Sequence, residues 1–275
     1  MIYFIAKIEN TVSLEAFMKA LITGASSGLG WEMATVLSEK GYDIVAVARR
    51  QERLQELKNQ LKTNVEILCA DVTSPDGIKQ IEAQLDDVDI FINNAGFGVF
   101  GPLCTSDLND ELDMFETNVK AVHILTKFAA KKFREKNSGY IMNVSSIAAF
   151  FPGPLFSAYY ASKAYVLRLT QALYEELRRE KSKVKVSVLC PGPVKTEFEQ
   201  VAKVSFGNGN EKGRNLIIAD KRKVSEYAID RMFKGKHIII PGKLMKVAVF
   251  FRRILPEKML CRVLYLLQSK KFVQY

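Results

Sequence analysis

Tyr159 and Lys163 are the two residues of this sequence whose types and spacing most directly suggest proton chemistry. They lie four positions apart in the stretch SAYYASKAY, residues 157–165, so a helix there would place both on one face. A phenol beside an ammonium group can donate or accept a proton, because the positive charge favours the phenolate. The alternative is an ordinary pair on an amphipathic helix, since Tyr and Lys at this spacing are common. Other parts of the chain favour one interpretation or the other.

A glycine-rich stretch, TGASSGLG, lies between a short apolar run and a helical pattern near the N-terminus. Gly24, Gly28 and Gly30 would let the backbone approach a pyrophosphate, and the N-terminus of the following helix would supply free N–H groups. A plain tight turn is the alternative. Three glycines at a strand-to-helix junction favour the phosphate-binding interpretation.

Two arginines follow the second apolar run, where a dinucleotide-binding fold that selects NAD usually has an acidic residue. Arg49 and Arg50 stand there, and guanidinium groups suit the 2′-phosphate of NADP. Solvated arginines at a helix N-terminus are the alternative, but positive charge opposes the helix dipole there, which favours a bound anion. The sequence therefore favours NADP, with Ser26 or Ser27 as additional donors.

Short apolar runs alternate with helical patterns along most of the chain, and this order predicts the fold. Strands this apolar, separated by helices, indicate a parallel sheet that is covered on both faces and binds its ligand at the carboxyl ends of the strands. We therefore expect an α/β, doubly wound Rossmann fold with a mostly seven-stranded parallel sheet and a C-terminal helical extension. The expected strands are 19–23, 43–48, 64–72, 88–96, 138–146, 184–192 and 236–242, and the expected helices include 29–41, 51–61, 107–136 and 157–180.

The composition fits a globular protein whose basic residues gather near the C-terminus. Of 275 residues, 48% are apolar and 25% are charged, which is enough to bury a large core. Residues 221–275 hold 14 Lys and Arg against 3 Asp and Glu, whereas the preceding residues hold 26 against 27. No nucleic-acid-binding motif accompanies this charge, so we expect no nucleic acid partner. The four cysteines and two histidines lack metal-ligand spacing, so we expect no metal.

The two ends of the chain differ from its centre, so we divide the sequence into residues 1–17, 18–242 and 243–275. The first segment does not resemble a signal peptide, and reduced cysteines favour a cytoplasmic protein. Translation starting at Met18, an additional ordered strand and an artefactual extension are all open for it. The last segment mixes apolar runs with Lys and Arg, and Pro256 should divide it into two short helices. Three interpretations are open: it closes a pocket of its own domain, joins two subunits, or lies on an anionic membrane surface.

A series of motifs in matching order and spacing resembles the short-chain dehydrogenase/reductase family over about residues 18–242. The motifs are TGASSGLG, Asp71 in CADV, NNAG at 93–96, Asn118 in ETNVKA, NVSS at 143–146, YYASK at 159–163 and PGPVKT at 191–196. The stretches NAGFGVFGP and ARRQERL are similar to the NADP-dependent bacterial oxidoreductase branch of that family. The resemblance implies a Rossmann-type catalytic domain, an NADP(H) cofactor, a small carbonyl or alcohol substrate, and a homo-oligomer, dimer or tetramer.

The resemblance also implies which residues form the site. The family motif of a tyrosine and a lysine four residues apart selects Tyr159 and excludes Tyr160, because Ala164 follows Tyr160 at that distance. The family serine lies 13 residues before the tyrosine, which selects Ser146 over Ser145. The expected catalytic residues are Asn118, Ser146, Tyr159 and Lys163, and the expected cofactor-binding residues are Gly24, Ser26, Ser27, Gly28, Leu29, Gly30, Arg49, Arg50, Asp71, Val72, Asn93, Ala95, Gly96, Tyr159, Lys163, Pro191, Gly192, Val194 and Thr196.

The implied chemistry is hydride transfer at a carbonyl carbon, with proton transfer by the protein. Tyr159 would donate the proton in reduction and remove it in oxidation. The ammonium group of Lys163 would lower the pKa of Tyr159 while binding the nicotinamide ribose. Ser146 would hydrogen-bond the carbonyl oxygen, and Asn118 would hold a water that relays protons through Lys163.

We therefore expect an NADP(H)-dependent oxidoreductase that interconverts a ketone or aldehyde and an alcohol, mainly by reduction. A hydrophobic carbonyl or 3-oxoacyl-type substrate fits the apolar residues expected in the pocket, and the glycine- and asparagine-rich stretch 202–215 is expected to form a mobile lid. The alternatives are a non-catalytic NADP-binding redox sensor or scaffold, and a membrane-associated reductase of lipid-linked carbonyls. The expected pocket residues are Phe97, Val99, Phe100, Phe150, Phe151, Leu155 and Phe156.

Overall fold

Seven parallel strands form one sheet in the order β3-β2-β1-β4-β5-β6-β7. The computed structural model describes residues 18–195, 197–198 and 219–269. The predicted seven-stranded, doubly wound sheet is confirmed, and the strand order reverses between β1 and β4, where such folds bind their ligands. The strands are β1 (Lys19–Thr23), β2 (Asp43–Ala48), β3 (Val65–Cys69), β4 (Ile90–Asn93), β5 (Tyr140–Val144), β6 (Lys185–Leu189) and β7 (Ile238–Ile239).

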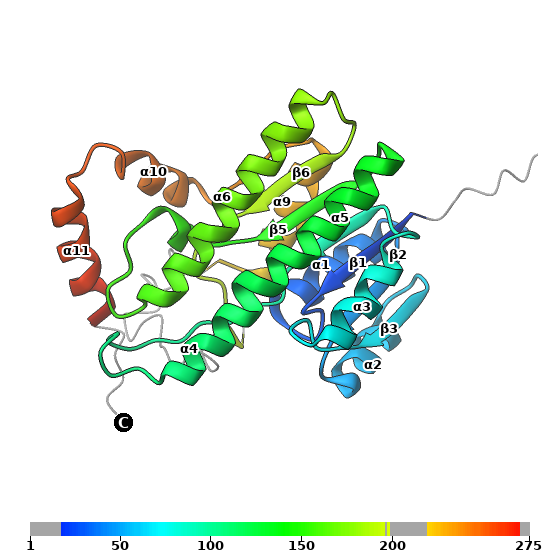
Figure 1. Ribbon diagram of the computed structural model, residues 1–275, viewed down its shortest axis with the longest axis horizontal. Coiled ribbons are helices and arrows are strands. Elements are labelled where there is room, and N and C mark those ends of the chain that lie inside the picture. The colour runs from blue at the N-terminus through cyan, green and yellow to red at the C-terminus, as the bar shows by residue number, and fades with distance from the viewer. Residues whose placement is uncertain (1–17, 196, 199–218, 270–275) are drawn as a thin grey trace, which may run out of the picture.

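Helices cover both faces of the sheet, because successive strand residues point to opposite sides. Ile22 of β1 belongs to a core shared with α1, α2 and α9, whereas its neighbour Leu21 belongs to a core shared with α3, α5 and α6 (Figure 1). The sheet is therefore buried on both faces, as its apolar strands predict. The helices are α1 (Gly28–Glu39), α2 (Gln51–Gln60), α3 (Pro75–Gln84), α4 (Leu108–Phe115), α5 (Val122–Lys136), α6 (Ser157–Arg179) and α9 (Lys221–Phe233).

Two features of these helices differ from the expectation. The stretch 107–136 is not one regular helix, because a π-helical segment, Glu116–Ala121, joins α4 to α5. The sequence pattern also did not identify α3, although its start signals are present. The Ser74 hydroxyl accepts a hydrogen bond from the N–H of Gly77 at 3.0 Å, and Pro75 occupies the first turn.

A chain of buried side-chain hydrogen bonds ties the central strands to α5 and α6. Asn93, at the end of β4, accepts from the hydroxyl of Thr23 in β1 and donates to that of Thr126 in α5, both at 3.4 Å. Asn143 in β5 accepts from Thr126 at 3.0 Å and donates to Thr170 of α6 at 2.9 Å. All five side chains are buried, so breaking one bond would leave a polar group unpaired in the core. The chain therefore fixes the strand ends relative to both helices.

Two helices, α10 (Lys243–Phe251) and α11 (Glu257–Ser269), stand on either side of Pro256, as predicted. They lie at one end of the molecule, beyond the start of α6 (Figure 1). Helix α10 has no fully buried residue, and α11 buries only Leu260 and Gln268. No helix in the described part of the chain is long and apolar enough to cross a bilayer. The expected extension at residues 1–17 and the expected lid at 202–215 lie outside the described residues.

Candidate active site

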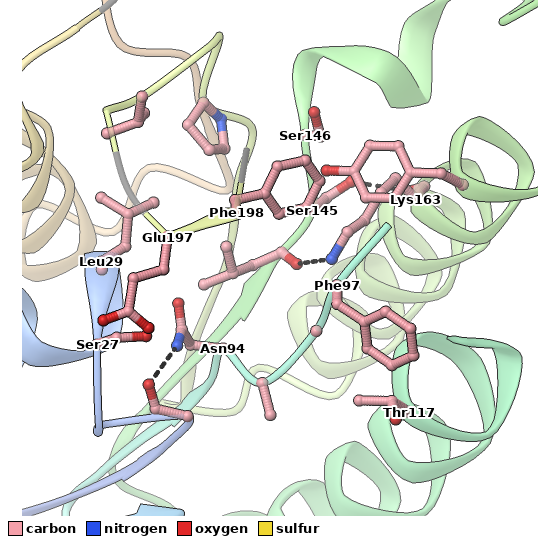
Figure 2. Close-up of a pocket in the computed structure, with 18 of the residues that line it drawn as sticks. Ser27, Leu29, Asn94, Phe97, Thr117, Ser145, Ser146, Lys163, Glu197 and Phe198 are labelled. Carbon is pink, nitrogen blue, oxygen red and sulfur yellow. Dashed lines mark hydrogen bonds between the residues drawn. The ribbon is translucent and has the colours of Figure 1, made fainter. Parts of the chain in front are cut away.

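A cavity of about 810 Å³ lies at the carboxyl ends of the strands, where the fold predicts a ligand. The segments that follow β1 to β6 form its walls together with the first turns of α6 and the end of α11. Figure 2 shows the part of these walls that carries Ser27, Asn94, Ser146 and Lys163. Residues far apart in the sequence therefore meet in one site. Among the residues that the structure describes, no three His, Cys, Asp or Glu side chains gather in a way that could hold a metal ion.

The turn between β1 and α1 leaves the N-terminus of α1 without a side-chain cap. Helix α1 begins at Gly28, and the Ser27 side chain that precedes it makes no capping hydrogen bond. Gly24 and Gly28 have positive φ angles of 68° and 57°, which glycine adopts without strain. Gly30 does not line the cavity; a Cβ there would lie 2.3 Å from the Gly24 carbonyl oxygen, so it keeps the turn tight. Uncapped N–H groups beside the cavity fit a pyrophosphate.

The two expected phosphate-binding arginines lie beside the cavity, and each already has an acidic neighbour. Arg50 donates to the Ser26 hydroxyl at 3.1 Å and to a Glu197 carboxylate oxygen at 2.9 Å. Arg49 is largely exposed, with a guanidinium nitrogen 3.8 Å from an Asp71 carboxylate oxygen. The guanidinium groups and serine hydroxyls fit a 2′-phosphate. Glu197, which the sequence analysis missed, would compete with that phosphate for Arg50.

Asp71 and the segment after β4 form the floor of the cavity. Partial burial raises the pKa of Asp71, but hydrogen bonds from Thr73 and the charge of Arg49 outweigh this effect and hold that pKa below its ordinary value. Ala95 and Gly96 line the cavity, as does Val72. A Cβ on Gly96 would lie 3.2 Å from the Lys163 Nζ, so glycine leaves room for that ammonium group.

Three of the four expected catalytic residues lie on one wall of the cavity. Lys163 donates from Nζ to the Val144 carbonyl at 3.2 Å, and its Nζ lies 5.8 Å from the centre of the Tyr159 ring. The Ser146 hydroxyl interacts with Tyr159 and accepts from the N–H of Ala148 at 3.1 Å. Ser145 instead donates to the Lys163 carbonyl at 2.7 Å (Figure 2). The structure therefore brings Ser146, not Ser145, to Tyr159.

Asn118 lies behind this wall, in the π-helical segment, and is fully buried. Its amide accepts from the Phe97 N–H at 3.1 Å and donates to the Phe97 carbonyl at 2.8 Å and the Ser162 hydroxyl at 3.2 Å. It does not line the cavity. Asn93 likewise lies below the cavity, in the buried hydrogen-bond chain. Both asparagines position the cavity walls through backbone and helix contacts.

The pKa values of Tyr159 and Lys163 correct one expectation. Burial raises the pKa of Tyr159 well above its ordinary value, and the hydrogen bond with Ser146 opposes only part of this shift. Burial also lowers the pKa of Lys163 to about 8. The expected lowering of the tyrosine pKa by the ammonium group is therefore wrong for this state, because desolvation disfavours both charged forms.

Aromatic side chains line the end of the cavity beyond Tyr159. Phe156 stacks on the Tyr159 ring with centroids 4.4 Å apart, and Phe97, Phe100, Tyr160 and Phe198 complete this wall. Four expected pocket residues, Val99, Phe150, Phe151 and Leu155, do not line the cavity. Phe150 instead packs against a separate core cluster that contains Leu167 and Val188. Pro191, Gly192 and Val194 lie along the opposite side as expected, whereas Thr196 lies outside the described residues.

The sequence also matches a known family. Residues 18–204 match the model of the short chain dehydrogenase family. The chain belongs to the short-chain dehydrogenase family of oxidoreductases. The shared fold and the cavity at the strand ends agree with this membership.

Individual relatives show how far this similarity extends. A short chain dehydrogenase of Pseudocercospora fijiensis is 34% identical over 190 residues, which make up 65% of this chain and 60% of that protein. The NADP-dependent 3-hydroxy acid dehydrogenase of Escherichia coli K12 is 32% identical over 216 residues, 76% of this chain and 86% of the relative. The solved structure of a short-chain dehydrogenase from Sphingobium yanoikuyae in complex with NADPH is 28% identical in sequence and has a TM-score of 0.74. The match covers 82% of this chain and 88% of that protein.

Several residues of this short-chain dehydrogenase line the cavity although the sequence analysis did not assign them, among them Asn94, Glu197 and Gln268. Asn94 donates to the Thr23 carbonyl at 2.9 Å, and the motif NNAG that contains it could have identified it. Glu197 and Gln268 had no such signal, because each reaches the cavity only through the tertiary fold.

We predict that Lys163 makes the stability of the ligand-free dehydrogenase depend on pH in the alkaline range. Its folded-state pKa of about 8 lies below the unfolded value of about 10.4, so the unfolded chain binds more protons between these limits. The free energy of unfolding of the wild type, relative to Lys163→Met, should therefore rise between about pH 8 and pH 10, by up to about 3 kcal/mol. Urea unfolding of both proteins across this range checks it, and a constant difference would contradict the lowered pKa.

Proposed function

We propose that this short-chain dehydrogenase reduces a ketone or aldehyde to an alcohol with NADPH, and catalyses the reverse reaction with NADP. One observation carries the proposal: Ser146, Tyr159 and Lys163 share one wall of a cavity that also contains an uncapped helix N-terminus and two arginines. A site that only binds a dinucleotide needs the helix terminus and the arginines. Cofactor binding alone does not require a phenol next to a serine hydroxyl.

The residues of the cavity wall transfer the proton, hydrogen-bond the carbonyl oxygen and bind the cofactor. NADPH, when bound, supplies the hydride to the carbonyl carbon. Tyr159 donates the proton to the carbonyl oxygen, and its raised pKa keeps it in the protonated form needed for reduction. The Ser146 hydroxyl accepts from a backbone N–H and can turn its own hydrogen toward that oxygen. Lys163 keeps further N–H donors for the nicotinamide ribose beyond the one given to Val144.

Asn118 acts in this proposal as a positioning residue. Its side-chain amide is hydrogen-bonded to the Phe97 backbone and to Ser162. It therefore fixes the position of the segment that carries Gly96 relative to Lys163. The expected water relay would then depend on the backbone of the π-helical segment rather than on this amide.

NADP is the favoured cofactor because of the groups around Arg50. Two guanidinium groups and the hydroxyls of Ser26 and Ser27 line this end of the cavity. The similarity to an NADP-dependent dehydrogenase of E. coli and to a structure in complex with NADPH supports the same choice. We further propose a homo-oligomer, as the resemblance implies, in the cytoplasm, which the reduced cysteines favour.

We predict that Tyr159→Phe abolishes turnover but retains NADPH binding. The substitution removes the proton donor and leaves the ring in place, so kcat should fall by about 10²–10⁴-fold. NADPH oxidation with a panel of ketones and aldehydes measures turnover, and fluorescence titration measures binding. Tyr165→Phe is the matched control, because Tyr165 lies on the same helix but on the surface, bonded to His123. Retained turnover in Tyr159→Phe would exclude this proton donor.

We predict that Arg49→Ala combined with Arg50→Ala weakens NADPH binding by about 10²-fold, through lost charge-assisted hydrogen bonds, and leaves NADH binding nearly unchanged. Titration with both cofactors measures the ratio of the two dissociation constants. Lys58→Ala is the control, because Lys58 is an exposed cation on the same helix, α2, and does not line the cavity. Equal weakening of both cofactors would refute the assignment to the 2′-phosphate.

A further inference from the structure

Helix α11 contributes one polar side chain to the aromatic end of the cavity. Gln268 is 2% exposed and lines the cavity although it lies 109 positions after Tyr159 in the sequence. Its Nε2 donates to the Tyr160 hydroxyl at 3.1 Å. Its Oε1 is buried and has no hydrogen-bond partner in the part of the chain that the structure describes. A buried amide oxygen without a partner is unfavourable, which points to a ligand group that satisfies it.

The Gln268 amide is held in place by Tyr160, whose own ring is fixed. The Tyr160 ring lies against Gly153, where a Cβ would be only 2.2 Å from a ring atom, so the ring has little freedom to move. Tyr160 in turn fixes the Gln268 amide through their hydrogen bond. A fixed acceptor of this kind can discriminate between ligands, because a ligand without a donor leaves it unpaired.

The charges at this end disfavour an acidic ligand. Asp113 and Glu116 line the cavity near the aromatic wall, and Glu116 is paired with Lys120 at 2.8 Å. Apart from Lys163 and the two arginines at the cofactor end, the described lining residues include no Lys or Arg. A carboxylate here would therefore meet the negative charge of Asp113, while the nearby Lys120 is already paired with Glu116.

We propose that the substrate is a neutral ketone with a hydroxyl group remote from its carbonyl, and that this hydroxyl donates to Gln268 Oε1. The proposal rests on the proposed function, since it assumes that the carbonyl lies at Tyr159. It separates this enzyme from its E. coli relative, whose name specifies a 3-hydroxy acid. A hydroxyl both donates and accepts, so Tyr160 can share it.

Matched ketones test this proposal. Acetophenone and benzylacetone are each compared with their para-hydroxyphenyl analogues, and acetoacetate serves as the acidic probe. The wild type should prefer a hydroxylated ketone over its partner by about tenfold in kcat/KM, the worth of one hydrogen bond. Gln268→Leu should lose this preference, because leucine offers the ligand hydroxyl no acceptor. Gln268→Glu, which keeps an acceptor oxygen, should retain the preference.

Two further measurements make the result decisive. Calorimetry of the same ketones on the NADPH complex of Tyr159→Phe measures binding without turnover and should show the same tenfold difference. Gln55→Leu, on the exposed surface of α2, is the control. No preference in any pair, a preference that survives Gln268→Leu, or better use of acetoacetate would overturn the proposal. Absence of turnover with every ketone would instead refute the proposed function.

The outer surface of α10 and α11 supports a second, independent inference. Leu244, Val247, Phe250 and Phe251 of α10 are about half exposed or more, and so are most apolar residues of α11 that face away from the domain. Figure 1 shows both helices at the edge of the molecule, and only the opposite side of α11 reaches the cavity. An exposed apolar surface formed by two consecutive helices is typical of an interaction site. The exposed apolar residues that continue it are Ile254, Met259, Val263, Leu266 and Leu267.

The charge of these helices decides which partner suits them. Residues 243–269 contain six Lys and Arg against one acidic residue, Glu257. A second copy of the chain would place these positive surfaces against each other, whereas anionic lipid headgroups would neutralise them. We infer that α10 and α11 dock the dehydrogenase on an anionic bilayer surface, with the apolar side chains among the acyl chains.

Vesicle flotation tests this inference. The full-length protein should float with vesicles of phosphatidylglycerol and phosphatidylcholine, and not with phosphatidylcholine alone. Phe250→Ser combined with Phe251→Ser should reduce flotation at least about tenfold, because two aromatic anchors are lost. Leu103→Ser combined with Leu108→Ser is the control, since both leucines are exposed elsewhere on the molecule. Light scattering on the same variants measures the oligomeric state.

Three results would overturn the membrane inference. These are absence of flotation, flotation that does not depend on anionic lipid, and flotation that the double phenylalanine variant retains. A dimer that the same variant dissociates, without vesicle binding by the wild type, would assign the surface to a second copy of the chain. Ketone reduction in solution should be the same in the variant and the wild type, because neither phenylalanine lines the cavity.

Discussion

The buried hydrogen bonds of Asn93 and Asn143 are the constraint on which the site depends. They join β1, β4 and β5 to α5 and α6 in a core that offers no water as a substitute partner. The segment with Gly96 continues from β4, Ser146 follows β5, and Tyr159 and Lys163 lie on α6. A shift of any one element would separate the phenol from the serine or the ammonium group from Gly96. The geometry of the cavity wall that carries Ser146, Tyr159 and Lys163 therefore follows from hydrogen bonds between side chains that do not line the cavity.

Burial then determines the electrostatics of that wall. The pKa of Tyr159 is raised and that of Lys163 is lowered, so the protein prefers both groups uncharged. A protonated phenol is the form that reduction consumes, and a lysine with a pKa of about 8 can lose or keep its proton near neutral pH. The sequence motif shows that the two residues are neighbours. Only the fold shows that both are desolvated, and desolvation reverses the direction expected for the tyrosine.

The sequence predicts those parts of the structure that depend on local pattern. Seven strands, the glycine turn and the pair on α6 follow from periodicity and spacing, with strand ends shorter by a few residues than predicted. Helix α3 was missed although Ser74 and Pro75 mark its start. Phe150 and Phe151 were wrongly placed in the pocket, since the sequence does not reveal which neighbours these side chains contact. Gln268 and Glu197 reach the cavity through contacts that span more than 100 residues.

Under the proposals made above, chemistry and specificity have different origins in this molecule. The residues around Tyr159 lie within the part of the chain that matches the family model, which ends at residue 204. Gln268 lies beyond it, on a helix with one side toward the cavity and the other toward solvent. The name of a relative thus carries information about the reaction and little about the substrate. Because the same helix lines the cavity and forms part of the proposed lipid-binding surface, a lipid that moves α11 would also move the Gln268 amide. Membrane contact and substrate selection would then be coupled through a single element.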